Sequence, residues 1–333
     1  MALVIGKSPL NEKMRPLPGV SFVVPVYNKA PHLPRVLAQI KAQSGNFHRQ
    51  YIFIDDGSTD NSLEILRKET VGWNDCVIEI QKNQGSAGAT NVGIALSTQP
   101  YIKFVDADDL LHEESTLHLL DTLKDSEACL IYGDVYRFGE DDEIDLQSSL
   151  RDTKVETIEA PLLLALKNSM FNPTQFLART DAIRQVGGCD ERVVHSQEYG
   201  LTLRLARLWP FLKTSATVAY IPQDAPGRLS TNEGRQLQRI TLAVSNFLMD
   251  HADLPFFVKQ FACRRLAGRA WRYAWRRGGE SKFGRWFWIN LAAQFPLPRD
   301  HAAFAARCVA AYELAECRGV DEHAPNYENS CAE

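Results

Sequence analysis

Three carboxylates follow the apolar run at residues 101–105, as Asp106, Asp108 and Asp109. A strand that ends in acidic residues places negative charge at the carboxyl edge of a sheet, where open α/β sheets bind their ligands. Clustered carboxylates repel one another unless a cation compensates them, and such oxygen donors suit Mg²⁺ or Mn²⁺ bridged to substrate phosphates. The pair Asp106 and Asp108 is therefore a candidate metal site. The alternative is that Asp108 or Asp109 caps a following helix.

The elements that must position these acids alternate along the chain. Apolar runs predict buried strands at 20–26, 50–54, 76–80 and 101–105, with helical patterns between them at 34–43, 58–66 and 85–96. This alternation is typical of parallel βαβ units, and continuously apolar strands favour a sheet that is covered on both faces. We therefore expect an α/β fold, with a mostly parallel, Rossmann-like sheet sandwiched by helices. The Gly-x-Gly-x-x-Gly fingerprint is absent, so the chain is not an obvious NAD enzyme.

The rest of the chain predicts further strands and a helical C-terminal part. Strands are expected at 128–135, 171–178 and 217–221, and helices at 157–168 and 201–209. Residues 233–318 are expected to be mostly helical.

Polar residues recur at the ends of the predicted strands. They are the segments 25–28, 55–58, 83–91 and 106–109. Tyr27 could stack on a base, Asp56 could accept from a base N–H, and Gly85 would let the backbone approach a ligand closely. Each feature alone has a plainer interpretation as core, turn or packing. Together, at corresponding strand ends, they predict a site for a nucleotide diphosphate.

The segments VSFVVPVYN, IFIDDGSTDNS, NQGSAGATNVGIA and YIKFVDADD resemble the ordered signatures of family 2 glycosyltransferases, which have the GT-A fold. The resemblance covers roughly residues 18–230. It implies inverting transfer of a sugar from a nucleotide donor, usually a UDP-sugar, assisted by Mg²⁺ or Mn²⁺. It also implies that Asp106 faces the ribose and the metal and that Asp108 ligates the metal. The nucleotide-binding residues that it implies are Pro25, Tyr27, Asn28, Asp56, Gly85, Asn91 and Asp106.

One position departs from the family pattern. The family often has Ala-Arg-Asn where this chain has Ala89-Thr90-Asn91. A basic partner for the diphosphate is therefore missing at Thr90, because a threonine hydroxyl donates one hydrogen bond but carries no charge.

A second block resembles the family's G-G-F-D-E segment followed by E-D-x-x-L-x-x-R. It comprises residues 187–191 and 196–205. The resemblance places the catalytic base on Glu198, with Gln197 in place of the preceding glutamate. Such a carboxylate would deprotonate the acceptor hydroxyl. The alternative is that Glu198 only forms a salt bridge with Arg204 or another basic residue on its helix. Arg228 lies where the family often carries a basic or polar residue near the diphosphate.

Size and composition limit the remaining choices. The chain has 333 residues and a net charge of -4, so charge does not predict a nucleic-acid partner. Seven scattered cysteines without a C-x-x-C pair favour a reducing compartment, and we expect a cytoplasmic protein that could also sit on the cytoplasmic face of a membrane. The predicted domains are a catalytic domain at 18–230, divided near 135 into nucleotide-sugar and acceptor halves, a helical extension at 231–318, and a disordered tail at 319–333.

Residues 255–300 are unusually basic. They include ten Lys or Arg, two Asp or Glu, and four of the six tryptophans. Arg265, Arg269, Arg272 and Arg276 share one helix face, while Val258, Ala262, Leu266, Ala270 and Tyr273 share another. This pattern is typical of a helix lying in an anionic membrane interface. The alternatives are a helix packed on the catalytic domain, or a nucleic-acid surface, for which no aromatic-basic motif is present.

These features predict a glycosyltransferase that modifies a glycan or lipid-linked acceptor in cell-surface polysaccharide biosynthesis. The alternative is a non-catalytic nucleotide-binding module, favoured by the changes at Thr90 and Gln197 and opposed by the intact Asp106 and Asp108. An aspartyl-phosphate hydrolase is disfavoured, because its D-x-D pair would follow the first strand and here the pair follows the fourth.

Overall fold

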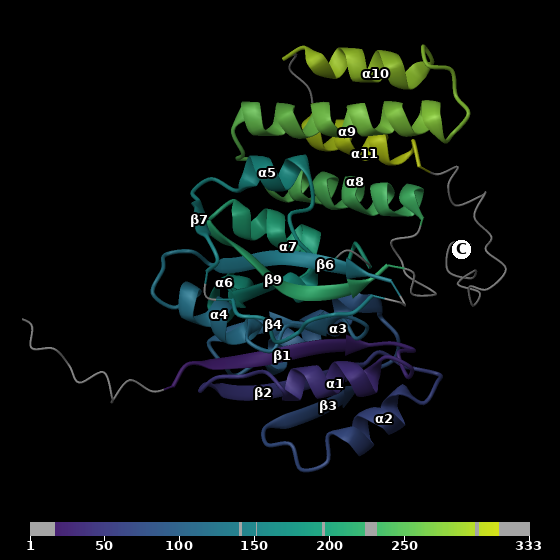
Figure 1. Cartoon of the computed structure of the whole chain (residues 1–333). Coiled ribbons are helices and arrows are strands. Elements are labelled where there is room, and N and C mark those ends of the chain that lie inside the picture. Colours follow the sequence, from purple (N-terminus) through teal and green to yellow (C-terminus); the bar gives the residue numbers. More distant parts are fainter. Residues whose placement is uncertain are drawn as a thin grey trace, which may run out of the picture.

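A nine-stranded mixed sheet forms the centre of the computed structural model (Figure 1). The structure describes residues 17–139, 142–150, 152–194, 197–223, 232–296 and 300–312. The strand order is β3-β2-β1-β4-β8-β6-β9-β5, with β7 paired to β9 outside this path.

The N-terminal half is parallel, as the alternating pattern predicts. β1 (Gly19–Val26) lies between β2 (His48–Asp55) and β4 (Tyr101–Phe104), and β3 (Cys76–Ile80) extends the sheet beyond β2. The connecting helices are α1 (Leu33–Lys41), α2 (Ser62–Glu69) and α3 (Gly85–Leu96). The central strands β1 and β4 are buried along their length because helices cover the sheet on both sides, whereas the edge strand β3 is partly exposed.

The second half adds antiparallel pairing. β8 (Phe176–Arg179) runs antiparallel to both β4 and β6 (Leu130–Phe138), and β9 (Phe211–Pro222) runs parallel to β6. The remaining elements are β5 (Leu110–Leu111), α4 (Ser115–Leu123), β7 (Val155–Ile158), α5 (Leu162–Lys167), η2 (Pro173–Gln175), α6 (Thr180–Gln185) and α7 (Gln197–Ala206).

Two predicted elements are wrong in detail. The helix expected at 157–168 is the edge strand β7 followed by the short helix α5, because residues 155–158 pair with β9. The strand expected at 171–178 begins as a 3-10 turn. There the Asn172 side chain and the Gln175 side chain cap each other's backbone N–H groups.

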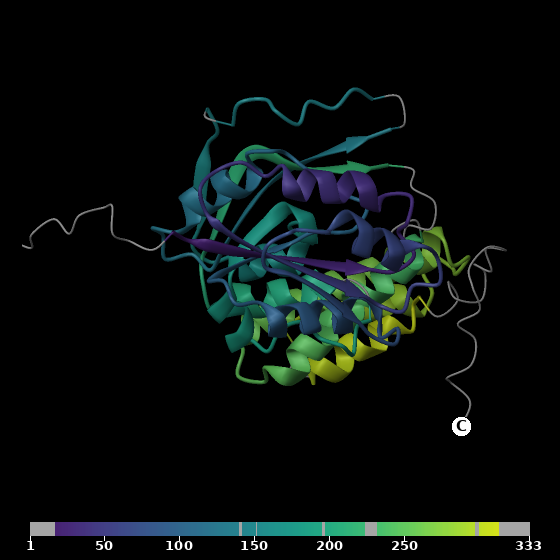
Figure 2. The same ribbon diagram turned by 90° about the horizontal axis from the view of Figure 1, so that it is seen from below.

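Side-chain alternation along β1 divides the core in two. Val20, Phe22 and Val24 face the helices α1, α2 and α4, whereas Val23 faces α3 and the C-terminal helices. Figure 2 shows α1 and the C-terminal helices on opposite sides of the sheet.

Four helices follow the sheet: α8 (Glu233–Asp250), α9 (Phe256–Arg276), α10 (Arg285–Gln294) and α11 (His301–Val309). Val258, Leu266 and Ala270 of α9 belong to the same apolar cluster as Val23 of β1. The sheet and the helices therefore share one core, and a domain boundary near residue 230 stays a prediction. The predicted tail at 319–333 lies outside the described residues.

The predicted membrane-lying orientation of α9 is wrong. Its apolar side chains are at most 4% exposed, at Val258, Ala262, Leu266 and Ala270. On its basic face, Arg265 and Arg269 each donate a hydrogen bond of 2.7 Å to the carbonyl oxygen of Lys167, at the C-terminus of α5. This helix is packed inside the helical layer, as the plainer alternative predicts. Across the described part of the chain, no helix combines the length and apolarity needed to cross a membrane.

Candidate active site

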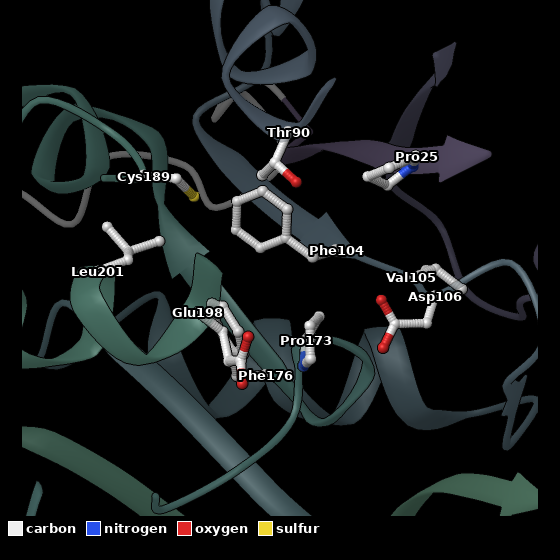
Figure 3. A pocket seen from close by; sticks show the side chains of 10 residues that line it. All are labelled: Pro25, Thr90, Phe104, Val105, Asp106, Pro173, Phe176, Cys189, Glu198 and Leu201. Atoms are coloured by element: carbon white, nitrogen blue, oxygen red, sulfur yellow. The ribbon is translucent and has the colours of Figure 1, made fainter. Parts of the chain in front are cut away.

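The site lies at the carboxyl ends of the central parallel strands. Val23 of β1 is in register with Phe104 of β4, so Pro25 comes beside the segment that carries Asp106. A pocket at this edge collects residues from β1, α3, β4, η2, β8 and α7 (Figure 3). The lining residues are Pro25, Thr90, Phe104, Val105, Asp106, Pro173, Phe176, Cys189, Glu198 and Leu201.

Glu198 and Asp106 bring two carboxylates to this pocket. Figure 3 shows them on opposite sides, with Pro173 between them in that view. Burial, and to a smaller extent the negative charge of Asp106, raise the pKa of Glu198 to about 7. A carboxylate with a pKa near the working pH can both accept and release a proton, as a general base requires.

Arg204 does not serve as the partner of Glu198. Its guanidinium donates to the carbonyl oxygens of Val186, Gly188 and Gly200, at 3.1, 2.5 and 3.2 Å. Within the described residues, no ion pair joins Glu198 to a basic side chain.

Asn91 of α3 holds the loop at residues 189–191, which precedes α7. Its Oδ1 accepts from the backbone N–H of Cys189 at 2.7 Å, and its Nδ2 donates to Glu191 Oε1 at 2.6 Å and to the Cys189 carbonyl at 3.1 Å. In this structure Asn91 joins α3 to the loop before α7, and a direct contact with nucleotide stays a prediction. Gln197 begins α7, and Arg228 lies outside the described residues.

The loop after β1 is fastened to the loop after β2. Asn28 has a φ of 52°, and its Oδ1 accepts from the backbone N–H of Thr59 at 2.8 Å. Its own N–H donates to Ser58 Oγ at 3.1 Å. Asparagine tolerates this left-handed conformation better than most residues, which explains its place after Tyr27. The partly buried Tyr27 is thereby carried on a rigid turn, and its stacking on a base stays a prediction.

Asp56 holds the loop between β3 and α3 through hydrogen bonds. Its Oδ1 accepts from Gln81 Nε2 and the N–H of Gln84, at 2.7 and 2.8 Å, and its Oδ2 accepts from the N–H of Gly85 at 2.9 Å. Gly85 has a φ of +81°, and a Cβ there would lie 2.2 Å from Val194 Cγ1, so both conformation and packing require glycine. The neighbouring Asp55 Oδ1 is buried without a hydrogen-bond partner. Both carboxylate oxygens of Asp56 are engaged within the protein, and its contact with a base N–H stays a prediction.

Lys29 supplies a positive charge that the sequence reasoning missed. Its Nζ donates to Asp108 Oδ2 at 2.6 Å, and the Lys29 and Asp108 side chains are 27% and 13% exposed. The positive charge that the family often carries at position 90 is therefore supplied here by Lys29, on the loop after β1 and beside Asp108. A single lysine after Tyr27-Asn28 gave no signal, because only the fold brings it to residue 108.

A buried network fixes the backbone that carries the acids. Thr174 Oγ1 donates to Asp109 Oδ2 at 2.7 Å and accepts from the N–H of Asp106 at 3.0 Å. The fully buried Lys103 donates to the carbonyl oxygens of Thr174 and Phe176, and burial lowers its pKa to about 7. The Asp109 carboxylate thus helps to hold the backbone that carries Asp106. Thr174 and Lys103 lie too far apart in sequence for the pattern to reveal this network.

A metal at Asp106 and Asp108 would have to share its ligands with a substrate. Among the described residues, no group of three or more His, Cys, Asp or Glu side chains could hold a metal ion. Mg²⁺ in nucleotide sites is usually held by one or two carboxylates together with substrate phosphates and waters, so Asp106 and Asp108 are a sufficient protein contribution. Lys29 Nζ lies beside Asp108 and would have to share or leave this carboxylate.

The fold and the site together define a nucleotide-binding transferase of the GT-A type. Residues 21–187 match the family described as glycosyl transferase family 2, and the chain belongs to this family.

Individual relatives agree with this assignment. Glycosyltransferase GlyG of Streptococcus pneumoniae is 34% identical over 124 residues, which are 37% of this chain and 41% of that protein. The match thus spans less than half of this curated relative. The structure of Staphylococcus aureus TarS residues 1–349 in complex with UDP-GlcNAc has a TM-score of 0.59 at 18% identity and 90% coverage of both chains. A mannosyltransferase from Pyrobaculum calidifontis, in complex with GDP-Man and Mn²⁺, has a TM-score of 0.55 at 14% identity, over 93% of this chain and 89% of that one. At these identities the structures establish a shared fold.

Proposed function

We propose that the protein is an inverting, metal-assisted glycosyltransferase that moves a sugar from a UDP-sugar to a hydroxyl of a glycan or lipid-linked acceptor, in cell-surface polysaccharide synthesis. The observation that carries this proposal is the placement of Glu198 opposite Asp106 in one pocket at the strand ends. One carboxylate serves the acceptor and the other serves the donor.

In this mechanism Glu198 takes the proton of the acceptor hydroxyl while that oxygen attacks the anomeric carbon. The new glycosidic bond forms as the bond from the anomeric carbon to the UDP oxygen breaks, so the configuration inverts and UDP leaves with the electron pair. Asp106 and Asp108 would hold a divalent ion, which supplies positive charge for the leaving diphosphate. Lys29 adds a second positive charge beside Asp108.

The nucleoside end of the donor belongs to the loops after β1 and β2. Pro25 and Tyr27 would pack on the nucleoside, and Asp56 would bind the N–H of uracil. Thr90 faces the pocket and would donate one hydrogen bond to the donor. A lipid-linked acceptor would bring the enzyme to a membrane surface, and residues 255–300 have the basic and aromatic composition for that contact.

Calorimetric titration of UDP, GDP and TDP, with and without Mn²⁺, tests the donor site. We expect Mn²⁺-dependent binding that is selective for UDP, followed by UDP release from UDP-sugars only when an acceptor is present. Binding of UDP without any turnover across sugar donors and acceptors would instead support the non-catalytic module. Selectivity for GDP would retain the enzyme and contradict the UDP-sugar assignment.

A further inference from the structure

An exposed aromatic cluster lies where α9 passes into α10. We call it the aromatic patch, and it consists of Trp271, Trp275, Phe283, Phe287 and Trp288. Phe283 and Trp288 are 65% and 62% exposed, and Trp275 is 37% exposed. This is far more aromatic surface than the packing of the two helices requires.

Ring contacts make the patch one continuous surface. Trp271 stacks on Trp275 with ring centroids 6.3 Å apart and meets Phe287 edge-on at 6.0 Å. Phe287 in turn contacts Phe283 at 5.3 Å and Trp288 at 5.2 Å. The Trp271 Nε1–H donates to the carbonyl oxygen of Lys282 at 2.9 Å, which ties the connecting loop to α9. The exposed rings are thus held in a fixed arrangement.

Helix α10 is apolar on both sides. Its inner side buries Trp286 and Ala293 against the rest of the helical layer, while Trp288 and Leu291 remain 62% and 38% exposed. A helix that is apolar all round is normally covered all round. Figure 1 shows α10 as the outermost helix, so its outer side faces away from the protein.

Positive charge surrounds these rings. Residues 271–288 contain five Lys or Arg and one Asp or Glu, in a chain whose net charge is -4. Lys282 Nζ lies over the rings of Trp275 and Phe283, at 5.2 and 5.8 Å from their centroids, and the Arg276 guanidinium lies 5.5 Å from that of Trp275. Aromatic rings interleaved with cations match an interface that has an apolar interior and an anionic surface.

We propose that the aromatic patch is the surface by which this protein sits on an anionic lipid membrane. Phe283 and Trp288 would enter the headgroup region, while Lys282 and Arg276 would contact lipid phosphates. This surface differs from the α9 faces that the sequence pattern favours, because the apolar face of α9 is core and two of its arginines bind α5. A second copy of the chain is a poorer occupant, since a symmetric contact would oppose like charges.

The place of the patch suits an acceptor that arrives from the membrane. Both views show the α9–α10 connection toward the same side of the molecule as the carboxyl end of β1, where the active site opens (Figures 1 and 2). Lipid binding through the patch does not depend on the catalytic assignment, because none of its residues lines the pocket.

Vesicle flotation of the full-length chain tests the proposal. The vesicles contain phosphatidylcholine alone or with about 30% phosphatidylglycerol. We expect flotation with the anionic vesicles only, accompanied by a blue shift of tryptophan emission. The double variant Phe283→Ser/Trp288→Ser should weaken binding at least about tenfold. Arg276→Glu/Lys282→Glu should also weaken it, by about fivefold or more per charge.

Phe257→Ser is the matched control. Phe257 is also an aromatic residue of the helical layer and is 62% exposed, but it lies at the opposite end of α9. This variant should bind vesicles like the wild type, and all variants should bind UDP like the wild type. Equal flotation by the Phe283→Ser/Trp288→Ser variant, or no flotation of the wild type, would overturn the proposal. So would self-association of the wild type that this variant abolishes without any lipid binding, because the patch would then join two copies.

Discussion

The Glu198 carboxyl gives the most direct test of the mechanism, because its burial predicts where activity changes with pH. Its pKa of about 7 means that about one molecule in eleven carries the ionised base at pH 6, about half at pH 7, and about ten in eleven at pH 8. We expect kcat/KM to rise about tenfold per pH unit below pH 6 and to level off above pH 8. Continuous measurement of UDP release across pH 5.5–9 provides the profile.

The metal should shift this profile in a known direction. Part of the rise in the Glu198 pKa comes from the negative charge of Asp106. A divalent ion bound to Asp106 compensates that charge, so the midpoint at saturating Mn²⁺ and UDP-sugar should lie below the midpoint measured for the free enzyme. Glu198→Gln should keep UDP binding and lower turnover by a factor of about 100 or more at pH 8, and by a smaller factor at pH 6, where most wild-type molecules already carry a protonated Glu198. A flat profile between pH 5.5 and 9 in the wild type would refute the assignment of Glu198 as base.

Stability provides a second readout that does not require turnover. The native state holds the Glu198 proton more tightly than the unfolded chain, because the pKa rises from 4.5 to about 7 on folding. The stabilising contribution of this carboxyl to the free energy of unfolding is therefore complete below about pH 4.5. It is lost as the pH rises through about 7, which lowers the free energy of unfolding by about 1–3 kcal/mol. Glu198→Gln removes this loss, so its stability relative to wild type should be higher at pH 8 than at pH 5. Equal differences at both pH values in urea melts would show that burial does not perturb this carboxyl.

Three further substitutions test the donor side of the site. Asp108→Asn should abolish the Mn²⁺ dependence of UDP binding measured by calorimetry, and unchanged Mn²⁺ dependence would remove Asp108 from the metal site. Lys29→Met should weaken UDP binding by about threefold to tenfold, because a partly screened charge beside Asp108 is lost. Lys29→Arg should retain most of the wild-type affinity. If both variants bind UDP as tightly as the wild type, Lys29 is only a local partner of Asp108. Thr174→Val should lower the free energy of unfolding by about 1–3 kcal/mol, since Asp109 and the Asp106 N–H each lose a buried partner, and should also weaken the Mn²⁺-dependent affinity for UDP. A loss of stability at unchanged affinity would limit Thr174 to a structural role.

The sequence predicts the parallel half of the fold well, because β1, β2, β3 and β4 are apolar runs with helices between them. Their carboxyl ends must then meet at one edge, which is why the pairing of Pro25 with the Asp106 segment could be expected. The second half is harder. β7 is an exposed edge strand whose pattern reads as helix, and only its pairing with β9 decides between the two.

The same distinction applies to the site. Asp106 and Glu198 carry family signatures, so their types and neighbours identify them. Lys29, Thr174 and Lys103 act through partners that are 65 or more residues away, and their neighbours in sequence give no hint of those partners. Long-range contacts of this kind depend on the folded sheet and cannot be read from a local pattern.

The core that the sheet shares with the C-terminal helices shows that the segment matched by the family model and the folded unit are not the same. The recognisable family match ends at residue 187, before Glu198 and before the helices α7–α11. A chain cut at that point would lose β9 and the core residues that α7–α11 contribute to the shared cluster. The segment that matches the family model is therefore shorter than the segment that builds the core. Grafting a new acceptor specificity onto this protein would have to exchange whole helices together with the core residues that pack against them.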